Sequence, residues 1–361
     1  MLLYEYSWQT CLEFSFLCVT FALNMTSHAS RRPAHPGGLR VLYVMKYDKK
    51  PIDAAEQIRK LKGRHLIVKD ETIASQYLYN ISYYRLRAYT YPFQNNSEGS
   101  DHEFLRTDIS FQDIIDLYCF DRRLRSLLFN AIEKIEVALR TRIALIYSVD
   151  EGTGHWFLNH KLYDKHDKFI ALTRNETIDD KKVVGDLMKE VQRSNEEFIL
   201  HYFRKYGEPE FPPAWMTLEV VSMGTLSKLF HALADTNKSS KAITRSLGLN
   251  KVGILKNWMH ALSSLRNICA HHSRIWNRRF TISLSFPYRT DAPFLSEQEF
   301  NAIRNNKLFA YISVILYVLQ IISPDSSFKT NLLQLLRERP KLVKIKDMGF
   351  PQEWEKYTLW R

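Results

Sequence analysis

Glycine is scarce in this chain, with 12 residues among 361. Because turn-rich β-structure depends on glycine at positions of positive φ, so few glycines favour a helical protein. Cysteine is also rare, and Cys11, Cys18, Cys119 and Cys269 show no paired spacing. This pattern argues against a disulfide framework and against a CxxC-type zinc site, and it is typical of a reducing compartment.

Sequence motifs of several large enzyme classes are also missing. The chain contains no GxxxxGK[ST] phosphate loop, no GxGxxG dinucleotide fingerprint, no GxSxG nucleophile elbow and no HExxH zinc motif. These absences disfavour P-loop enzymes, dinucleotide-dependent enzymes, α/β-hydrolases and zincin proteases. The formal net charge of +12 favours an acidic partner, either nucleic acid or a membrane surface, without choosing between them.

The first 44 residues differ in character from the rest. Residues 1–24 are apolar and aromatic, but Glu5 and Glu13 interrupt them. The longest clean apolar run is therefore about ten residues, too short to span a bilayer. The segment also lacks the positive n-region and cleavage site of a signal peptide. We expect translation to start at Met25 or Met45, with 1–44 as an extension before a single domain at 45–361.

Apolar residues recur at helical spacing along the chain and predict an all-α fold, a helical bundle with additional helices. The longest pattern, Phe111–Val149, keeps a spacing of about 3.5 residues, which is typical of a bundle helix. The other expected helices are Ile52–Lys62 (stopped by Gly63), Glu71–Tyr79, Val183–Arg204, Met216–Leu233, Lys241–Leu247, Val252–Ser273, Asn301–Ile322 and Ser327–Glu338. Asn301–Ile322 is strongly apolar, but its charges and Pro324 argue for a core helix rather than a membrane span.

Aromatic and basic residues alternate in NISYYRLRAYTYPF. Tyr84 could stack on a base, and Arg85 and Arg87 could clamp phosphates, so this segment is a candidate for RNA binding. The alternative, which such spacing favours, is that the rings pack in the core and the arginines brace neighbouring helices.

The long helix carries a dense band of arginines. The candidates for RNA binding there are Arg122, Arg123, Arg125 and Arg140. Pairs at i,i+4, such as Glu136 with Arg140, indicate that part of this charge supports the helix. A solvated face is the default interpretation, and a band opposite Arg266 would instead form a phosphate-binding wall.

The densest group of chemically active side chains lies in Met259–Phe280, MHALSSLRNICAHHSRIWNRRF. Asn267 and His271 are four residues apart on one helix face, with Arg266 about a third of a turn away. Arginine offers a planar fork to phosphate oxygens, and histidine exchanges protons near neutral pH. His272, Arg274 and Asn277 are supporting candidates. We expect no metal at the C-x-H-H cluster, because no second ligand pair follows at finger-like spacing.

The string LRNICAHHSRIWNR resembles the hallmark of the Abi-like (AbiD/AbiF, abortive infection) family of phage-defence proteins within the HEPN superfamily, whose signature is R-x4-6-H. The segment FDRRLRSLLFNAIEKIEVALR gives a second match, and the resemblance covers roughly Met45–Trp354. It implies an all-α fold, a homodimer in which the two motifs face each other, and metal-independent cleavage of cellular or phage RNA without a cofactor. His271 would act as general acid or base, Arg266 would stabilise the phosphorane, and Asn267 would hold the phosphate or orient His271.

The resemblance also sets the expected setting of the protein. RNA is the expected partner, and the cytoplasm is the expected location, without stable membrane insertion. An antitoxin protein or a small RNA would restrain the activity. Two other interpretations remain open at this stage. The chain could be a non-catalytic helical module that binds RNA or protein, or a membrane-associated defence effector that uses its apolar N-terminus.

Overall fold

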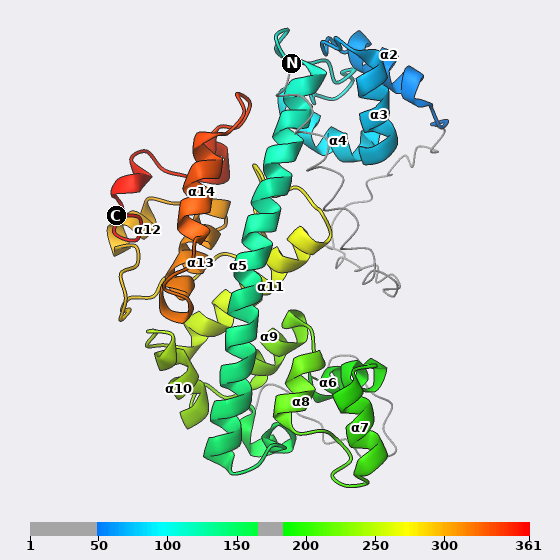
Figure 1. Cartoon of the computed structure of the whole chain (residues 1–361). Coiled ribbons are helices and arrows are strands. Elements are labelled where there is room, and N and C mark those ends of the chain that lie inside the picture. Colours follow the sequence, from blue (N-terminus) through cyan, green and yellow to red (C-terminus); the bar gives the residue numbers. More distant parts are fainter. Residues whose placement is uncertain (1–48, 165–182) are drawn as a thin grey trace, which may run out of the picture. The chain divides into compact units, whose positions relative to one another are not determined.

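The computed structural model describes residues 49–164 and 183–361. The chain divides into two units, Met1–Pro51 and Ile52–Arg361, and every helix described here lies in the second (Figure 1). These residues contain thirteen α-helices, and their only β-pairing consists of isolated bridges, which confirms the predicted all-α fold. The expectations about residues 1–44 fall outside the described residues.

The helices, in chain order, are α2 (Ala54–Gly63), α3 (Glu71–Ile81), α4 (Tyr83–Thr90), α5 (Phe111–Glu151), α6 (Val183–Arg193), α7 (Glu197–Lys205), α8 (Ala214–Val220), α9 (Met223–Ala232), α10 (Lys238–Ser246), α11 (Val252–Ala270), α12 (Glu297–Asn301), α13 (Leu308–Ile322) and α14 (Phe328–Arg337). Short 3₁₀ helices are η3 (Tyr91–Phe93), η4 (Trp156–Leu158), η5 (His160–Leu162), η6 (Ile345–Met348) and η7 (Trp354–Lys356).

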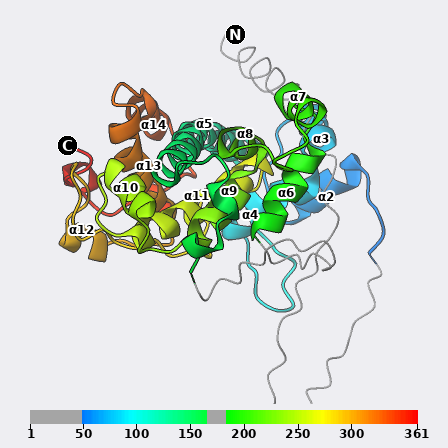
Figure 2. The same ribbon diagram turned by 90° about the horizontal axis from the view of Figure 1, so that it is seen from below.

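Helix α5 is the element around which the others pack. A capping box between Ser110 and Asp113 starts it, and Gly152, at φ 66°, ends it after 41 residues. At 1.5 Å per residue such a helix is about 60 Å long. It contacts α4, α8, α10, α11, α13 and α14. Figure 2 shows α13 and α14 on one side of α5 and α8 on the other.

The core is one continuous cluster that includes the apolar stripe of α5. Helix α13 is buried from Leu308 to Leu319, as expected for a core helix. Helix α11 packs against α9 and α5 and buries Leu262, Leu265 and Cys269. The core therefore fixes the helix that carries the R-N-x-x-x-H motif.

Three expected helices are interrupted. Val183–Arg204 is two helices, α6 and α7, because the Ser194 hydroxyl accepts the Glu196 N–H in a polar turn between them. Met216–Leu233 is also two helices, because Val221 is extended and Ser222 caps α9 by accepting the Thr225 N–H. Asn301–Ile322 becomes a continuous helix only from Leu308 onward.

Two local features of the first helices also differ from expectation. Gly63 does not stop α2, because the helix includes it. The helix ends in the turn that follows, where His65 has φ 69° and the Leu66 N–H donates to Leu61 O at 3.1 Å. Helix α4 was not expected from the pattern. It starts at Ser82, whose hydroxyl accepts the Arg85 N–H at 3.3 Å.

Candidate functional site

The C-terminal end of α11 is a Schellman turn with histidine in place of glycine. Ser273 N–H donates to Ile268 O at 3.0 Å, and His272 N–H donates to Cys269 O at 3.0 Å. His272 itself has φ 56°, a left-handed conformation that glycine usually provides. Instead of extending one face of the helix, His272 therefore lies beyond its end and is exposed.

Arg266 lies against α5 on one side through an ion pair and a ring contact, while its buried Nε has no hydrogen-bond partner among the described residues. Its Nε lies 3.7 Å from Glu136 Oε2, and its guanidinium carbon lies 5.6 Å from the centre of the Phe129 ring. The Glu136 side chain is 12% exposed, and its other oxygen accepts from Arg140 at 2.7 Å. The Arg266 side chain keeps one third of its surface exposed. Part of the guanidinium therefore remains available to an anion.

Asn267 and His271 are both exposed on the face that follows Arg266. His271 closes the helix by donating its backbone N–H to Asn267 O at 2.9 Å. The Asn267 side-chain oxygen lies 3.4 Å from Arg266 Nη1. No side-chain hydrogen bond or ion pair among the described residues engages the His271 imidazole. The arrangement brings an anchored guanidinium, an amide and an accessible imidazole to one surface.

The neighbouring groups brace this surface. Arg85, from α4, donates to His272 O at 2.9 Å, and Arg274 donates from Nη1 to Ala88 O. His272 is exposed as a residue, but neighbouring groups displace part of the water around its ring, and this desolvation, together with the nearby charges of Arg125, Arg85 and His271, lowers the pKa of His272 from its usual value. The His272 ring is therefore neutral over a wider pH range. Asn277, at φ 49°, accepts from Lys307 at 3.3 Å.

A buried carboxylate fastens the segment after the motif to α5. Asp121 is fully buried, and its oxygens accept the Trp276 N–H at 2.7 Å and the Tyr89 hydroxyl at 2.7 Å. Arg125, also buried, pairs with the same carboxylate and donates to the Tyr89 hydroxyl at 3.0 Å. Asp121 thus links α4, α5 and the Trp276 turn. The sequence signal is its register: a charged residue stands on the apolar stripe, four residues after Leu117.

The candidates for RNA binding separate into different environments. Arg125 and Arg140 are both buried. Arg125 pairs with Asp121, and Arg140 pairs with Glu136 and donates to the carbonyls of Leu218 and Val221. Neither arginine is therefore exposed to RNA. Their register on the buried side of α5 explains why the arginine band is not a single face. The remaining candidates are the exposed Tyr84, Arg85 and Arg123 and the half-buried Arg87 and Arg122. Arg87 contacts His102 at 3.1 Å.

Cys269, inside the motif, is poorly suited to act as a nucleophile. Its thiol is buried, and burial raises its pKa to about 12. A thiol with this pKa stays protonated at neutral pH. Across the described parts of the chain, no three His, Cys, Asp or Glu side chains gather closely enough to hold a metal ion.

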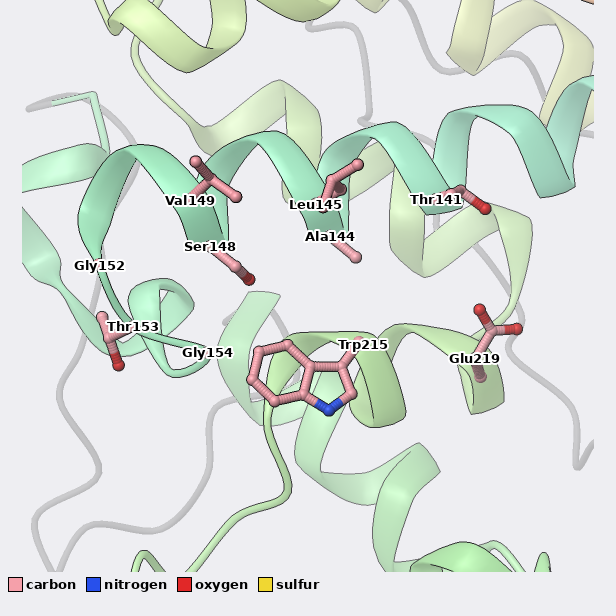
Figure 3. A pocket seen from close by; sticks show the side chains of 10 residues that line it. All are labelled: Thr141, Ala144, Leu145, Ser148, Val149, Gly152, Thr153, Gly154, Trp215 and Glu219. Carbon is pink, nitrogen blue, oxygen red and sulfur yellow. The ribbon is translucent and has the colours of Figure 1, made fainter.

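A second concave feature lies near the other end of α5. It is an open apolar pocket of about 550 Å³ between the last turns of α5, residues 152–154 and α8 (Figure 3). Its walls include Leu145, Val149 and Trp215, with Glu219 one turn from Trp215. None of the motif residues lines it. The pocket is therefore separate from the candidate site.

The model of the Abi-like protein family matches residues 76–277, more than half of the chain, and this span includes Asp121, Glu136 and the motif. No curated protein and no solved structure matches the chain. Among the described residues, no helix is both long and apolar enough to cross a membrane. The chain therefore belongs to the Abi-like protein family, whose name associates it with abortive-infection defence against bacteriophages.

Proposed function

We propose that the protein is an endoribonuclease of the HEPN type that acts in abortive infection and cleaves RNA without a metal ion. The observation that carries this proposal is the end of α11, where exposed Asn267 and His271 stand beside an Arg266 that Glu136 holds in place. A guanidinium, an amide and an imidazole on one surface suit a phosphate better than a neutral ligand.

The chemistry follows from these side chains. The 2′-hydroxyl of RNA attacks the adjacent phosphorus while the P–O5′ bond breaks, which leaves a 2′,3′-cyclic phosphate and a 5′-hydroxyl. One base must take the 2′-proton, and one acid must give a proton to the leaving 5′-oxygen. His271 serves one of these steps, and Arg266 stabilises the charge on the phosphorane oxygens.

A single copy offers one His271 for two proton transfers. In the proposed homodimer the two motifs face each other, so the partner supplies the second histidine. His271 is exposed and makes no side-chain hydrogen bond among the described residues, which leaves its ring available for this arrangement. An antitoxin protein or a small RNA that covers this surface would restrain the activity.

Glu136 is proposed as a positioning residue. It touches Arg266 but lies on α5, and it shares its carboxylate with the buried Arg140. Glu136→Gln should lower kcat about 10- to 100-fold with little change in KM, because a misplaced guanidinium costs transition-state stabilisation more than RNA binding. Glu133→Gln, an exposed residue on the same helix, is the control and should leave both constants unchanged. Equal effects of the two substitutions would refute the positioning role.

The decisive experiment measures cleavage of single-stranded RNA by the purified full chain in EDTA. His271→Ala should lower the rate by roughly 10² to 10⁴, and Arg266→Ala by about 10² to 10³. His260→Ala is the matched control, since His260 is an exposed histidine on the same helix. Wild-type cleavage that requires added metal would contradict the proposal. Binding of RNA without cleavage by any version would favour a non-catalytic binding module.

A further inference from the structure

The segment that follows the motif contains more positive charge than the motif itself. Residues 274–279 include Arg274, Arg278 and Arg279. This segment leads directly out of the turn that Asp121 holds. Its direction is therefore fixed relative to α11.

A second positive segment packs against the first. Phe280 N–H donates to Asn306 O at 2.9 Å, Leu284 N–H donates to Asn305 O at 3.1 Å, and Lys307 Nζ donates to Asn277 Oδ1 at 3.3 Å. These bonds place the turn at 304–307, just before α13, beside the segment after the motif. Arg304 and Lys307 thereby join the arginines of that segment.

The cations are close enough to influence one another. Partial burial lowers the pKa of Lys307, and the charges of Arg304, Arg279 and Arg274 lower it further, while Asp347 acts in the opposite direction. Lys307 is held by Asn277 and by Asp347 O at 3.0 Å. Its ammonium is therefore a fixed charge next to Arg279 and Arg304.

Little on the protein neutralises the two outer arginines. Arg279 and Arg304 are exposed, and no hydrogen bond or ion pair among the described residues engages either side chain. Some exposed cations of the described chain do have an acidic partner, as Lys228 has in Asp186 at 2.9 Å. Asp347 offsets part of the charge at Lys307, but the cations of the cluster outnumber it, and an anionic ligand relieves the repulsion among them.

We propose that Arg279, Arg304 and Lys307 form a subsite that binds the phosphate backbone of single-stranded RNA beside the bond cleaved at His271. This inference rests on the proposed function, which it deepens by assigning where the rest of the RNA lies. The cluster would position the strand through phosphates and would not read the bases.

The surroundings favour RNA over an anionic membrane. Membrane-surface sites combine basic residues with apolar side chains that enter the lipid. None of the exposed large hydrophobic side chains among the described residues lies in 274–280 or 301–308. The cluster also continues directly from the motif. The proposal places a strand bound at His271 across these cations.

The test measures binding of a fluorescent single-stranded RNA at several salt concentrations. The protein is the full chain with His271→Ala, so that cleavage does not interfere. Arg279→Gln with Arg304→Gln is compared with Lys241→Gln with Arg245→Gln, two exposed cations of α10 that carry the same total charge. Lys307 is left intact because it bonds the protein.

The cluster variant should bind RNA at least tenfold more weakly at low salt. Because each lost phosphate contact removes about 0.7 from the slope of log K against log salt, its slope should fall by about 1.4. The control pair should change affinity and slope much less. Equal effects of the two pairs, or a selective loss of binding to anionic vesicles with RNA binding intact, would overturn the inference.

This outcome is separable from the proposed function. Cleavage is measured on chains with His271 intact. If those chains cleave RNA and the cluster variant binds it normally, the subsite fails and the ribonuclease proposal stands. If no version cleaves but the cluster variant loses RNA binding, the subsite stands and the catalytic assignment fails.

Discussion

Asp121 shows how one buried charge can organise a surface site. Its carboxylate accepts hydrogen bonds from the Trp276 backbone and the Tyr89 hydroxyl, and it pairs with Arg125. It touches none of the proposed catalytic side chains, yet it determines where the chain goes after His271. A buried ion pair of this kind contributes little net stability but is costly to break, because removing one partner leaves the other charge unpaired.

Asp121→Ala should therefore destabilise the fold by about 3–5 kcal/mol, because Arg125 would remain buried without a counter-charge. Urea unfolding monitored by circular dichroism measures the change. Asp325→Ala, at an exposed aspartate, is the control and should stay within about 0.5 kcal/mol of wild type. A loss below 1 kcal/mol for Asp121→Ala would show that the network is not coupled to folding.

Substitution of His272 tests whether this position contributes to stability through its left-handed backbone or through its imidazole. His272→Gly removes a left-handed strain of about 1 kcal/mol, partly offset by the flexibility of glycine in the unfolded chain. The expected result is unchanged stability or a gain of up to about 1 kcal/mol in urea unfolding. At His271, with φ −84°, glycine should instead cost about 0.5–1 kcal/mol. A clear loss of stability in His272→Gly would indicate that the imidazole itself contributes to folding.

At the scale of elements, the periodic pattern predicted most helices because their apolar faces are continuous. It missed the breaks at Ser194 and Ser222, where a hydroxyl accepts a backbone N–H at the junction of two helices without changing the apolar spacing. It did not assign α4, whose short sequence mixes buried Tyr89 with exposed Tyr84. Single-sequence patterns detect a face more reliably than they detect a cap.

The candidate site was predictable only in part for a related reason. The motif was identified from its residue types, and Asn267 and His271 share an exposed face, as helical spacing requires. The sequence did not predict the contact between Glu136 and Arg266, because the two residues are 130 positions apart. Spacing alone explained Glu136 as an i,i+4 partner of Arg140, and that pair is also present.

Substitution along α5 should show the asymmetry between its two faces. Ile135 is fully buried, whereas Val137, two residues later, is 55% exposed. Ile135→Ala should reduce the free energy of unfolding by about 2–5 kcal/mol, since it leaves a cavity where α5 meets its neighbours. Val137→Ala should change it by less than about 0.5 kcal/mol. Comparable losses from both would mean that the exposed face of α5 is covered in solution.

At the scale of the whole molecule, the described core begins with Ala54 and runs to Trp360. It includes residues from both sides of the family match at 76–277, so α2, α13 and α14 are integral to the fold. The helix that carries the motif and the turn at 304–307 are held by this shared core. A site built from both depends on the packing of the whole unit.

Trp215, on the wall of the pocket in Figure 3, has an optical consequence. It is 56% exposed, whereas Trp156, Trp258, Trp276, Trp354 and Trp360, the other indoles in the described residues, are all buried. An exposed indole emits at longer wavelength than a buried one and is accessible to aqueous quenchers. In a Trp8→Phe variant, whose indoles all lie in the described residues, the red edge of the fluorescence spectrum therefore reports on the α5–α8 pocket. A shift of that edge when a ligand is added to this variant would indicate that the ligand occupies the pocket.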